Sequence, residues 1–215
     1  MATDAAEAPA QPPSNFSQAR HFYLAVDRLE FKMETLVDLL GVAGQRPSLP
    51  MVVCCSSRDE LDTVCSAVAN LPFISLASLY SDLVETDRSR VLEKFRQAAL
   101  RWNLKPAAQL EDEAEAAESK FKSNMIVVTD ACLPLLASGE APISARMLIN
   151  YALPTKKFHD ACLKETYMRR MTTCLAADGI VINMVVGGEV VTLNNIEEST
   201  SLLIAEMPIN ISEIL

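Results

Sequence analysis

Two stretches decide the fold of this protein, Asn124-Met-Ile-Val-Val-Thr-Asp130 and Met147-Leu-Ile-Asn-Tyr-Ala-Leu-Pro154. Each contains a short apolar run that ends in polar residues, which is typical of a buried parallel strand whose carboxyl end opens into a ligand crevice. The residues between them, Ala131–Ile143, predict a short helix and a loop, because Gly139 and Pro142 lie near the end of the segment. The block therefore predicts a strand, helix, strand crossover unit of an α/β domain.

The rest of the chain repeats this alternation of strands and helices. Apolar runs predict further strands at His21–Val26, Met51–Cys55, Phe73–Leu76 and Ile180–Val186. Apolar residues at helical spacing predict helices at Leu29–Leu40, Arg58–Asn70, Glu85–Leu100 and Leu193–Ala205. We expect Gly41 to end the first helix, and Ser57 with Glu60 to form a capping box at the start of the second. The alternation predicts a single α/β domain with a doubly wound, mostly parallel sheet and helices on both faces.

Composition divides the 215 residues into one core and two polar additions. Residues 1–18 are rich in Ala, Pro, Gln and Ser without periodicity, which predicts a disordered leader. The core is predicted to span residues 19–215, and half of the chain is hydrophobic, which is enough to bury a sizeable interior. An insertion near Trp102–Lys122 is predicted to be solvated and partly helical, because it shows no apolar face and Glu111–Glu118 alone holds five acidic residues.

Charge and cysteine spacing exclude several classes of function. A formal net charge of −9 argues against strong nonspecific binding of nucleic acid, which depends on neutralising phosphates. The six cysteines show no Cys-x-x-Cys spacing, and His159 with Cys162 has no second pair nearby, so we predict no metal site. No apolar run approaches the roughly 18 residues that span a bilayer, and the start of the chain lacks the features of a signal or transit peptide. We therefore expect no membrane association and a location in the cytosol or nucleus.

Six stretches of the chain have counterparts, in the same order, in one family of proteins. They are His21–Val26 with the following Lys32–Leu40, Met51–Asp62, Glu85–Arg88, Thr129–Asp130, Leu148–Thr155 and Glu206–Leu215. Together they resemble the C-terminal RecA-like lobe of DEAD-box RNA helicases of the translation-initiation-factor type. The resemblance covers the chain from about His21 to its end and implies the P-loop NTPase fold for a single RecA-like domain.

The chain departs from that family in the motifs that bind and hydrolyse the nucleotide. The family completes its motif V with Arg-Gly-x-Asp, whereas Leu135–Glu140 keeps the glycine and lacks the arginine. In the stretch that resembles motif VI only Arg170 is retained, and the positions of the two arginine fingers fall on Thr173 and Ala176. No Gly-Lys pair occurs in the 215 residues, so the phosphate-binding loop of the family's N-terminal lobe is not present in this sequence. The resemblance thus implies no catalytic residue and no bound cofactor.

Five residues are candidates for contact with RNA or with another lobe. Arg58 and Arg88 are expected to start helices at the carboxyl edge of the sheet, where guanidinium groups meet phosphates; the alternative is that both are solvated. The resemblance implies that Thr129 and Asp130 serve RNA contact and coupling between lobes; the alternative is a strand end that caps the next helix. Arg170, with its neighbour Arg169, adds local positive charge, which a solvated helix face explains equally well.

The sequence therefore predicts a catalytically inactive, single-lobe relative of the DEAD-box helicases. It is expected to act as a protein-interaction or regulatory module in RNA metabolism or translation, with protein partners and weak binding of single-stranded RNA. The alternative is a subunit of an RNA-dependent ATPase or RNA helicase, completed in trans by the N-terminal lobe of another chain. A gene fragment without a selected role is a third reading.

Overall fold

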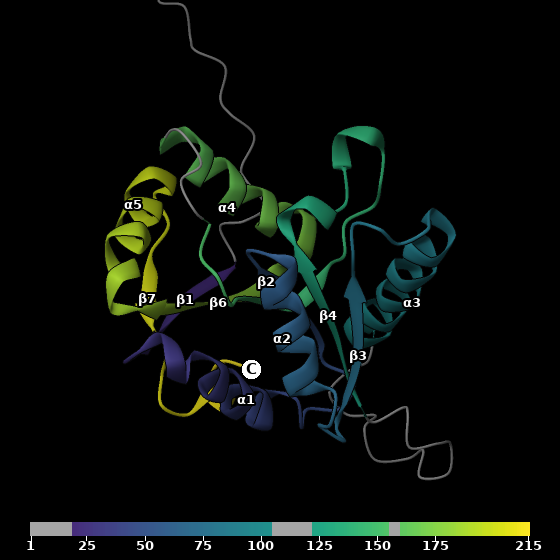
Figure 1. Cartoon of the computed structure of the whole chain (residues 1–215), viewed down its shortest axis with the longest axis horizontal. Helices are drawn as coiled ribbons and strands as arrows, with labels where there is room; N and C mark the ends of the chain where they lie inside the picture. Colours follow the sequence, from purple (N-terminus) through teal and green to yellow (C-terminus); the bar gives the residue numbers. More distant parts are fainter. Residues whose placement is uncertain (1–18, 105–121, 155–159) are drawn as a thin grey trace, which may run out of the picture.

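A single parallel sheet forms the centre of the molecule (Figure 1). The computed structural model describes residues 19–104, 122–154 and 160–215, with side chains from 163 in the last range. Within these residues seven strands lie in the order β3-β4-β2-β5-β6-β1-β7, and every pairing is parallel. The strands are β1 (Arg20–Val26), β2 (Pro50–Cys55), β3 (Ile74–Leu79), β4 (Ser123–Thr129), β5 (Ala145–Asn150), β6 (Leu175–Val186) and β7 (Ile204–Glu206). The predicted α/β fold with one doubly wound sheet is confirmed.

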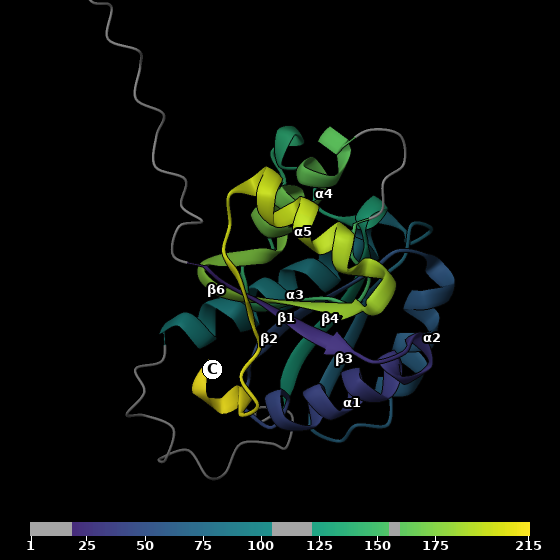
Figure 2. The same ribbon diagram turned by 90° about the vertical axis from the view of Figure 1, so that its left-hand side faces the viewer.

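Helices cover both faces of the sheet, as Figure 2 shows from the side. The helices are α1 (Lys32–Ala43), α2 (Arg58–Val68), α3 (Glu85–Leu104), α4 (Asp160–Cys174) and α5 (Val190–Thr200). One apolar core joins the sheet to α3, α4 and α5, and a second joins its other face to α1 and α2. Strand β2 is buried along its whole length, with Val52 in the first core and Val53 in the second. Burial of such a side chain contributes about 1.5–3 kcal/mol to folding, which explains the continuous apolar runs in the sequence.

The start of α2 shows how the loop after β2 is held. The side-chain oxygen of Ser57 accepts a hydrogen bond from the backbone N–H of Glu60 at 3.2 Å, as a capping box requires. The Glu60 carboxylate accepts from the N–H of Ser56 at 2.6 Å and from its hydroxyl at 2.9 Å, instead of from the N–H of Ser57. The predicted capping box is therefore half formed, and Glu60 instead fixes the residue that follows the strand.

The connection between β4 and β5 differs from the predicted strand, helix, strand unit. It contains two 3-10 turns, η4 (Asp130–Cys132) and η5 (Leu136–Ser138), and no α-helix. Pro134 disfavours helical geometry at the residue before it, and Leu133 is extended with φ −61° and ψ 145°. Gly139 then ends η5 with φ 85°, a conformation that favours glycine. In the sheet, β2 lies between β4 and β5, so these two strands are not neighbours.

Two predicted helix ends were wrong. Helix α1 continues through Gly41 to Ala43, because its apolar stripe still has Ala43 to bury in the core beside α2. Helix α5 ends at Thr200, because Ser201 adopts a left-handed conformation with φ 56°. Ala205, which was predicted to be helical, instead lies in the short edge strand β7 opposite Phe22.

Helix α3 extends into the segment that was predicted to be a solvated insertion. Its last turn includes Trp102, whose side chain is partly buried and packs against the core beneath α1 and α2. The acidic stretch Glu111–Glu118, the leader 1–18 and His159 lie outside the described residues, as does the side chain of Cys162.

Candidate functional site

The carboxyl ends of three adjacent strands form the candidate site. Strands β4, β2 and β5 lie side by side, so Thr129, Cys55 and Asn150 finish at the same edge of the sheet. Asp130 begins the turn η4 directly after β4. Helix α4 packs against β5 and β6 on one face and carries Arg170 to this edge. Ligands of open α/β sheets bind outside such carboxyl ends.

The guanidinium group of Arg170 forms a bidentate ion pair with Asp130. Its Nε lies 2.6 Å from Oδ1 of Asp130, and one terminal nitrogen lies 2.8 Å from Oδ2. The other terminal nitrogen donates to Oδ1 of Asn150 at 3.0 Å and to the carbonyl of Ala152 at 2.6 Å. The Arg170 side chain is only 1% exposed, whereas that of Asp130 is 35% exposed. Arg170 is thus buried in the interior, and Asp130 is the member of the ion pair that solvent or a ligand can reach.

Burial and hydrogen bonding act in opposite directions on this arginine. Burial by itself lowers the pKa of Arg170, because it disfavours the charged form. The hydrogen bond and charge of Asp130 outweigh burial, so the pKa of Arg170 is raised above its ordinary value. A buried, fully charged arginine of this kind is stable only with its partner present. The ion pair therefore fixes the turn η4 to helix α4.

A chain of buried polar side chains continues from Arg170 across the sheet. The amide of Asn150 donates to Oδ1 of Asn183 at 2.8 Å, and the amide of Asn183 donates to the Tyr167 hydroxyl at 3.2 Å. That hydroxyl lies 3.2 Å from Nδ1 of His21, whose Nε2 is buried without a hydrogen-bond partner among the described residues. Burial raises the pKa of Tyr167 to about 12 and lowers the pKa of His21 to about 4. Both side chains are therefore neutral near pH 7.

This polar chain was not predicted from the sequence. Asn150 ends β5 directly after an apolar run, and Asn183 interrupts the apolar run of β6; these two polar residues were the available signal. A buried polar side chain needs a partner, so two such residues on neighbouring strands indicate a pair. Their register, which places Asn150 opposite Asn183, exists only in the folded sheet.

Arg88 also lies at this edge and is neutralised by an acidic residue. It forms an ion pair with Glu140, and one of its terminal nitrogens is 3.5 Å from the carbonyl of Cys132 in turn η4. The hydrogen bond to Glu140 raises the pKa of Arg88, and the hydrogen bonds from Arg88 and from the N–H of Leu135 lower the pKa of Glu140. The Arg88 side chain is 16% exposed. The pair fastens the β4–β5 connection to the start of α3.

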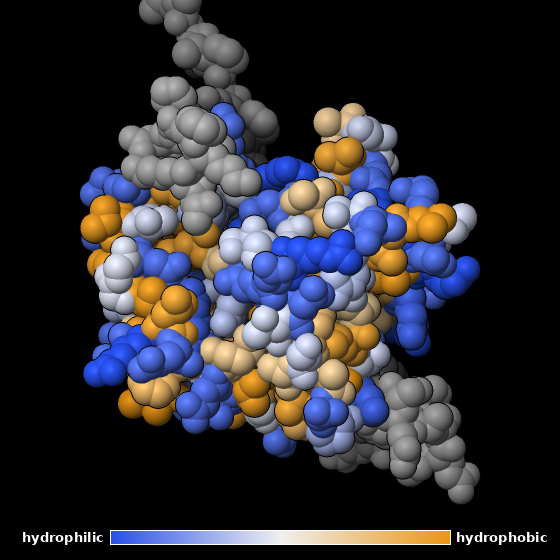
Figure 3. Space-filling view, viewed as in Figure 1, coloured by the Kyte–Doolittle hydropathy of each residue, from blue (hydrophilic) through white to orange (hydrophobic). Residues whose placement is uncertain are grey.

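Arg58 is the most accessible of the five predicted site residues. It is the first residue of α2, and its side chain is 57% exposed. Its guanidinium lies 5.0 Å from the ring centre of Tyr80 and 3.0 Å from the carboxylate of Asp82. Figure 3 shows a largely hydrophilic surface over the middle of the molecule, where α2 lies. The arginine and the aromatic ring are both available at the surface.

The structure thus brings the five candidates to one edge of the sheet but into separate contacts. Asp130 pairs with Arg170, Arg88 contacts the carbonyl of Cys132 in the same turn, and Arg58 pairs with Asp82. Thr129 makes no side-chain capping bond, and its hydroxyl lies 3.4 Å from the sulfur of Cys132. Contact with RNA or with another lobe remains a prediction for all five.

Comparison with known proteins identifies the relatives of this chain. No model of a known protein family matches it. Eukaryotic initiation factor 4A of Cryptosporidium parvum is 26% identical over 198 residues, which cover 91% of this chain and 40% of that protein. The ATP-dependent RNA helicase eIF4A of Mycosarcoma maydis is 24% identical over the same length. The chain is therefore similar in sequence to initiation factor 4A, an ATP-dependent RNA helicase. It spans about 40% of the length of these relatives.

Solved structures show which part of a DEAD-box helicase this fold corresponds to. The C-terminal domain of the DEAD-box protein Dbp5 matches with a TM-score of 0.60 and 16% identity, over 92% of this chain and 94% of that domain. The Escherichia coli DEAD-box protein SrmB, bound to regulator of ribonuclease activity A, matches with a TM-score of 0.62 and 18% identity, over 90% of this chain and 92% of that one. The predicted resemblance to the C-terminal RecA-like lobe is therefore confirmed at the level of fold.

Thr173 and Ala176, the two positions predicted to correspond to the family's arginine fingers, carry no positive charge. Thr173 is buried in the last turn of α4, where its hydroxyl donates to the carbonyl of Arg169. Ala176 lies in β6, and Arg169 is exposed on α4. Among the described residues no cluster of His, Cys, Asp or Glu is arranged to hold a metal ion. In the same residues no helix is both long enough and apolar enough to span a membrane.

Proposed function

We propose that this DEAD-box-like lobe is catalytically inactive and acts as a protein-interaction or regulatory module in RNA metabolism or translation. The observation that carries the proposal is the chemistry of α4 and the start of β6. The resemblance implies that Thr173 and Ala176 correspond to the family's arginine fingers, and Arg170, the arginine that is retained, is held in the interior by Asp130. The lobe therefore offers no free guanidinium at these three positions.

The absence of arginine fingers would greatly lower the rate of phosphoryl transfer. Phosphoryl transfer depends almost entirely on positioning and on stabilising charge, and an arginine finger contributes about 10³–10⁵ in rate. Neither a hydroxyl nor a methyl group can supply that charge. The proposal holds for this lobe whatever else the protein contains, because both fingers belong to the C-terminal lobe of the family.

Charge favours a protein partner over RNA. Arg88 is paired with Glu140 and Arg170 with Asp130, so of the four arginines near this edge Arg58 and Arg169 are the exposed ones. Binding of single-stranded RNA is then expected to be weak and steeply dependent on salt. A solved structure of the Dbp5 C-terminal domain contains Gle1, which supports a protein partner for a lobe of this fold, and a structure of the longer Dbp5 chain contains RNA. We place the function in the cytosol or nucleus.

An ATPase assay tests the inactivity. The chain is assayed alone, with single-stranded RNA, and with RNA plus an equimolar isolated N-terminal lobe of initiation factor 4A, and the whole factor serves as the positive control. We expect no turnover above background in any mixture that lacks the whole factor. RNA-stimulated turnover that requires both lobes and disappears with Arg170→Met would instead support the subunit completed in trans.

An RNA titration tests the order of partners. Substitution of Arg88 and Asp130 by alanine would break two ion pairs that hold turn η4, so a loss of RNA binding could come from a disturbed turn. A substitution at the surface avoids this ambiguity. Arg58→Ala removes the exposed arginine at the site, and Arg90→Ala, 78% exposed on α3, is the matched control. We expect micromolar or weaker binding that only Arg58→Ala reduces. Nanomolar binding near physiological salt would make RNA the primary partner.

A further inference from the structure

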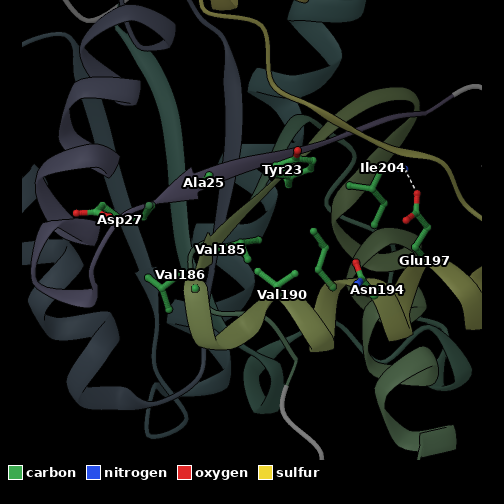
Figure 4. Close-up of a pocket in the computed structure, with 12 residues that line it drawn as sticks. Tyr23, Ala25, Asp27, Val185, Val186, Val190, Asn194, Glu197 and Ile204 are labelled. Atoms are coloured by element: carbon green, nitrogen blue, oxygen red, sulfur yellow. Dashed lines mark hydrogen bonds between the residues drawn. The ribbon is translucent and has the colours of Figure 1, made fainter.

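A groove lies near the carboxyl ends of β1 and β6, between these strands and helix α5 (Figure 4). Its volume is about 630 Å³. Its wall is mainly apolar and is formed by Tyr23, Ala25, Val185, Val190, Leu193 and Ile204. Val190 is 46% exposed, and its neighbour Val191 is 69% exposed. Figure 3 shows apolar patches among polar ones over α5, at the left of that view.

The groove also contains a stretch of sheet edge that β7 does not cover. Strand β7 pairs with His21, Phe22 and Tyr23 only, and its last bond runs from the N–H of Met207 to the carbonyl of Tyr23 at 2.9 Å. Backbone groups alternate sides along a strand, so the N–H and C=O of Ala25 face the same side as those of Tyr23. Ala25 is exposed and lies beyond the last residue of β7. An extended segment whose end reaches this part of the edge can therefore add hydrogen bonds at Ala25.

Carboxylates mark both ends of the groove, as Figure 4 shows. Asp27 lies at one end with its side chain 86% exposed, and its ion pair with Arg28 is long at 3.9 Å. Glu197 lies at the other end and uses one oxygen to accept from the N–H of Ile204 at 3.0 Å. The described residues that line the groove include no basic side chain. The sequence from Val186 to Leu215 contains no lysine or arginine either, so the charge of this face is negative.

We infer that the groove binds an extended segment of a protein partner, with apolar side chains at alternate positions and a basic residue at each end. The apolar side chains would enter between β1 and α5, the backbone would pair with Ala25, and the basic ends would meet Asp27 and Glu197. The groove lining runs from Ile204, which is level with His21, to Asp27, a span of about six residues or about 20 Å. Strand β7 covers the edge of β1 as far as Tyr23, so the segment pairs with β1 only at its end near Asp27. A heptapeptide in extended form has this length.

This inference rests on the proposed function, because it names the chemistry of a protein partner for the same module. Its test involves neither ATP nor RNA. Failure of the peptide to bind would leave the inactivity of the lobe untouched, and ATPase activity would not remove the groove.

The test uses fluorescein-labelled heptapeptides and the ¹⁵N-labelled chain. The probe is Lys-Val-Thr-Val-Thr-Val-Lys, and its matched control replaces both lysines by glutamate. We expect the basic probe to bind at least about tenfold more tightly than the acidic one, with the difference reduced by added salt. In NMR titrations the amide signals of Ala25 and Val190 should shift, and those of Arg58 and Arg88 should not.

Paired variants separate the groove from its surroundings. Val190→Asp should weaken binding of the basic probe about tenfold or more, whereas Val191→Asp, on the same helix but outside the groove, should not. A probe methylated on its backbone nitrogens should bind about tenfold more weakly, because it cannot donate to the carbonyl of Ala25. Equal binding of basic and acidic probes, equal effects of the two valine variants, or binding that methylation does not change would overturn the inference.

Discussion

The ion pair between Asp130 and Arg170 allows one prediction to be worked out in detail. The substitution Asp130→Ala removes the carboxylate and leaves the guanidinium buried, 1% exposed, with only Asn150 and the carbonyl of Ala152 as acceptors. Loss of one partner of a buried ion pair typically costs about 3–5 kcal/mol, because a charge is left uncompensated. Asp130 is 35% exposed, so water can reach part of the vacated space. We therefore expect the lower end of that range, about 3 kcal/mol.

The matched control is Asp82→Ala, which removes an exposed carboxylate from its pair with Arg58. Both members of that pair are more than half exposed, so the expected cost is below about 1 kcal/mol. Urea denaturation of the three proteins, followed by circular dichroism, gives the difference in free energy of unfolding. For a chain of this size a loss of about 3 kcal/mol lowers the melting temperature by about 6–12 °C.

A second background tests the cause. In Arg170→Met the guanidinium is already absent, so adding Asp130→Ala should cost less than about 1 kcal/mol, because no buried charge remains to be stranded. If Asp130→Ala costs no more than Asp82→Ala, or costs the same with and without Arg170, the argument that this pair holds turn η4 is refuted.

Three further predictions concern the buried histidine and the backbone. Burial lowers the pKa of His21 from 6.5 to about 4, so the unfolded state binds the proton first as the pH falls. The free energy of unfolding should therefore drop by about 3 kcal/mol between pH 6.5 and 4. In urea denaturation at a series of pH values, His21→Gln should lack this drop. Gly41→Ala should raise the free energy of unfolding by about 0.5–1 kcal/mol, because a Cβ at residue 41 would meet no atom within 4 Å. Gly44→Ala should lower the free energy of unfolding, because a Cβ at residue 44 would lie 2.6 Å from the carbonyl oxygen of Leu40. Ser201→Gly should stabilise the chain by up to about 1 kcal/mol in the same assay, because Ser201 has φ 56°, and a decrease would show that its side chain matters more than its backbone.

The fold class followed from the sequence because it depends on local pattern. Apolar runs such as Met51–Cys55 are long enough for a strand and too short for a helix, and each is followed by an amphipathic segment. That alternation leaves a parallel sheet with crossover connections as the solution. The prediction that Thr173 and Ala176 stand at arginine-finger positions also came from the sequence, because the absence of a charged side chain is a property of the residue itself.

The strand order and the polar site were decided only by tertiary structure. The sequence of Asn124–Thr129 does not indicate that β2 lies between β4 and β5. Strand β7 has only three residues, too few for a pattern of apolar residues to predict a strand. Arg170 read equally well as a solvated residue, because its burial depends on Asp130, forty positions away. A charged side chain is stable in the interior only when a partner of opposite charge lies beside it. The contact between Asp130 and Arg170 arises from the packing of helix α4 on the sheet, and the spacing of residues along the chain does not encode that packing.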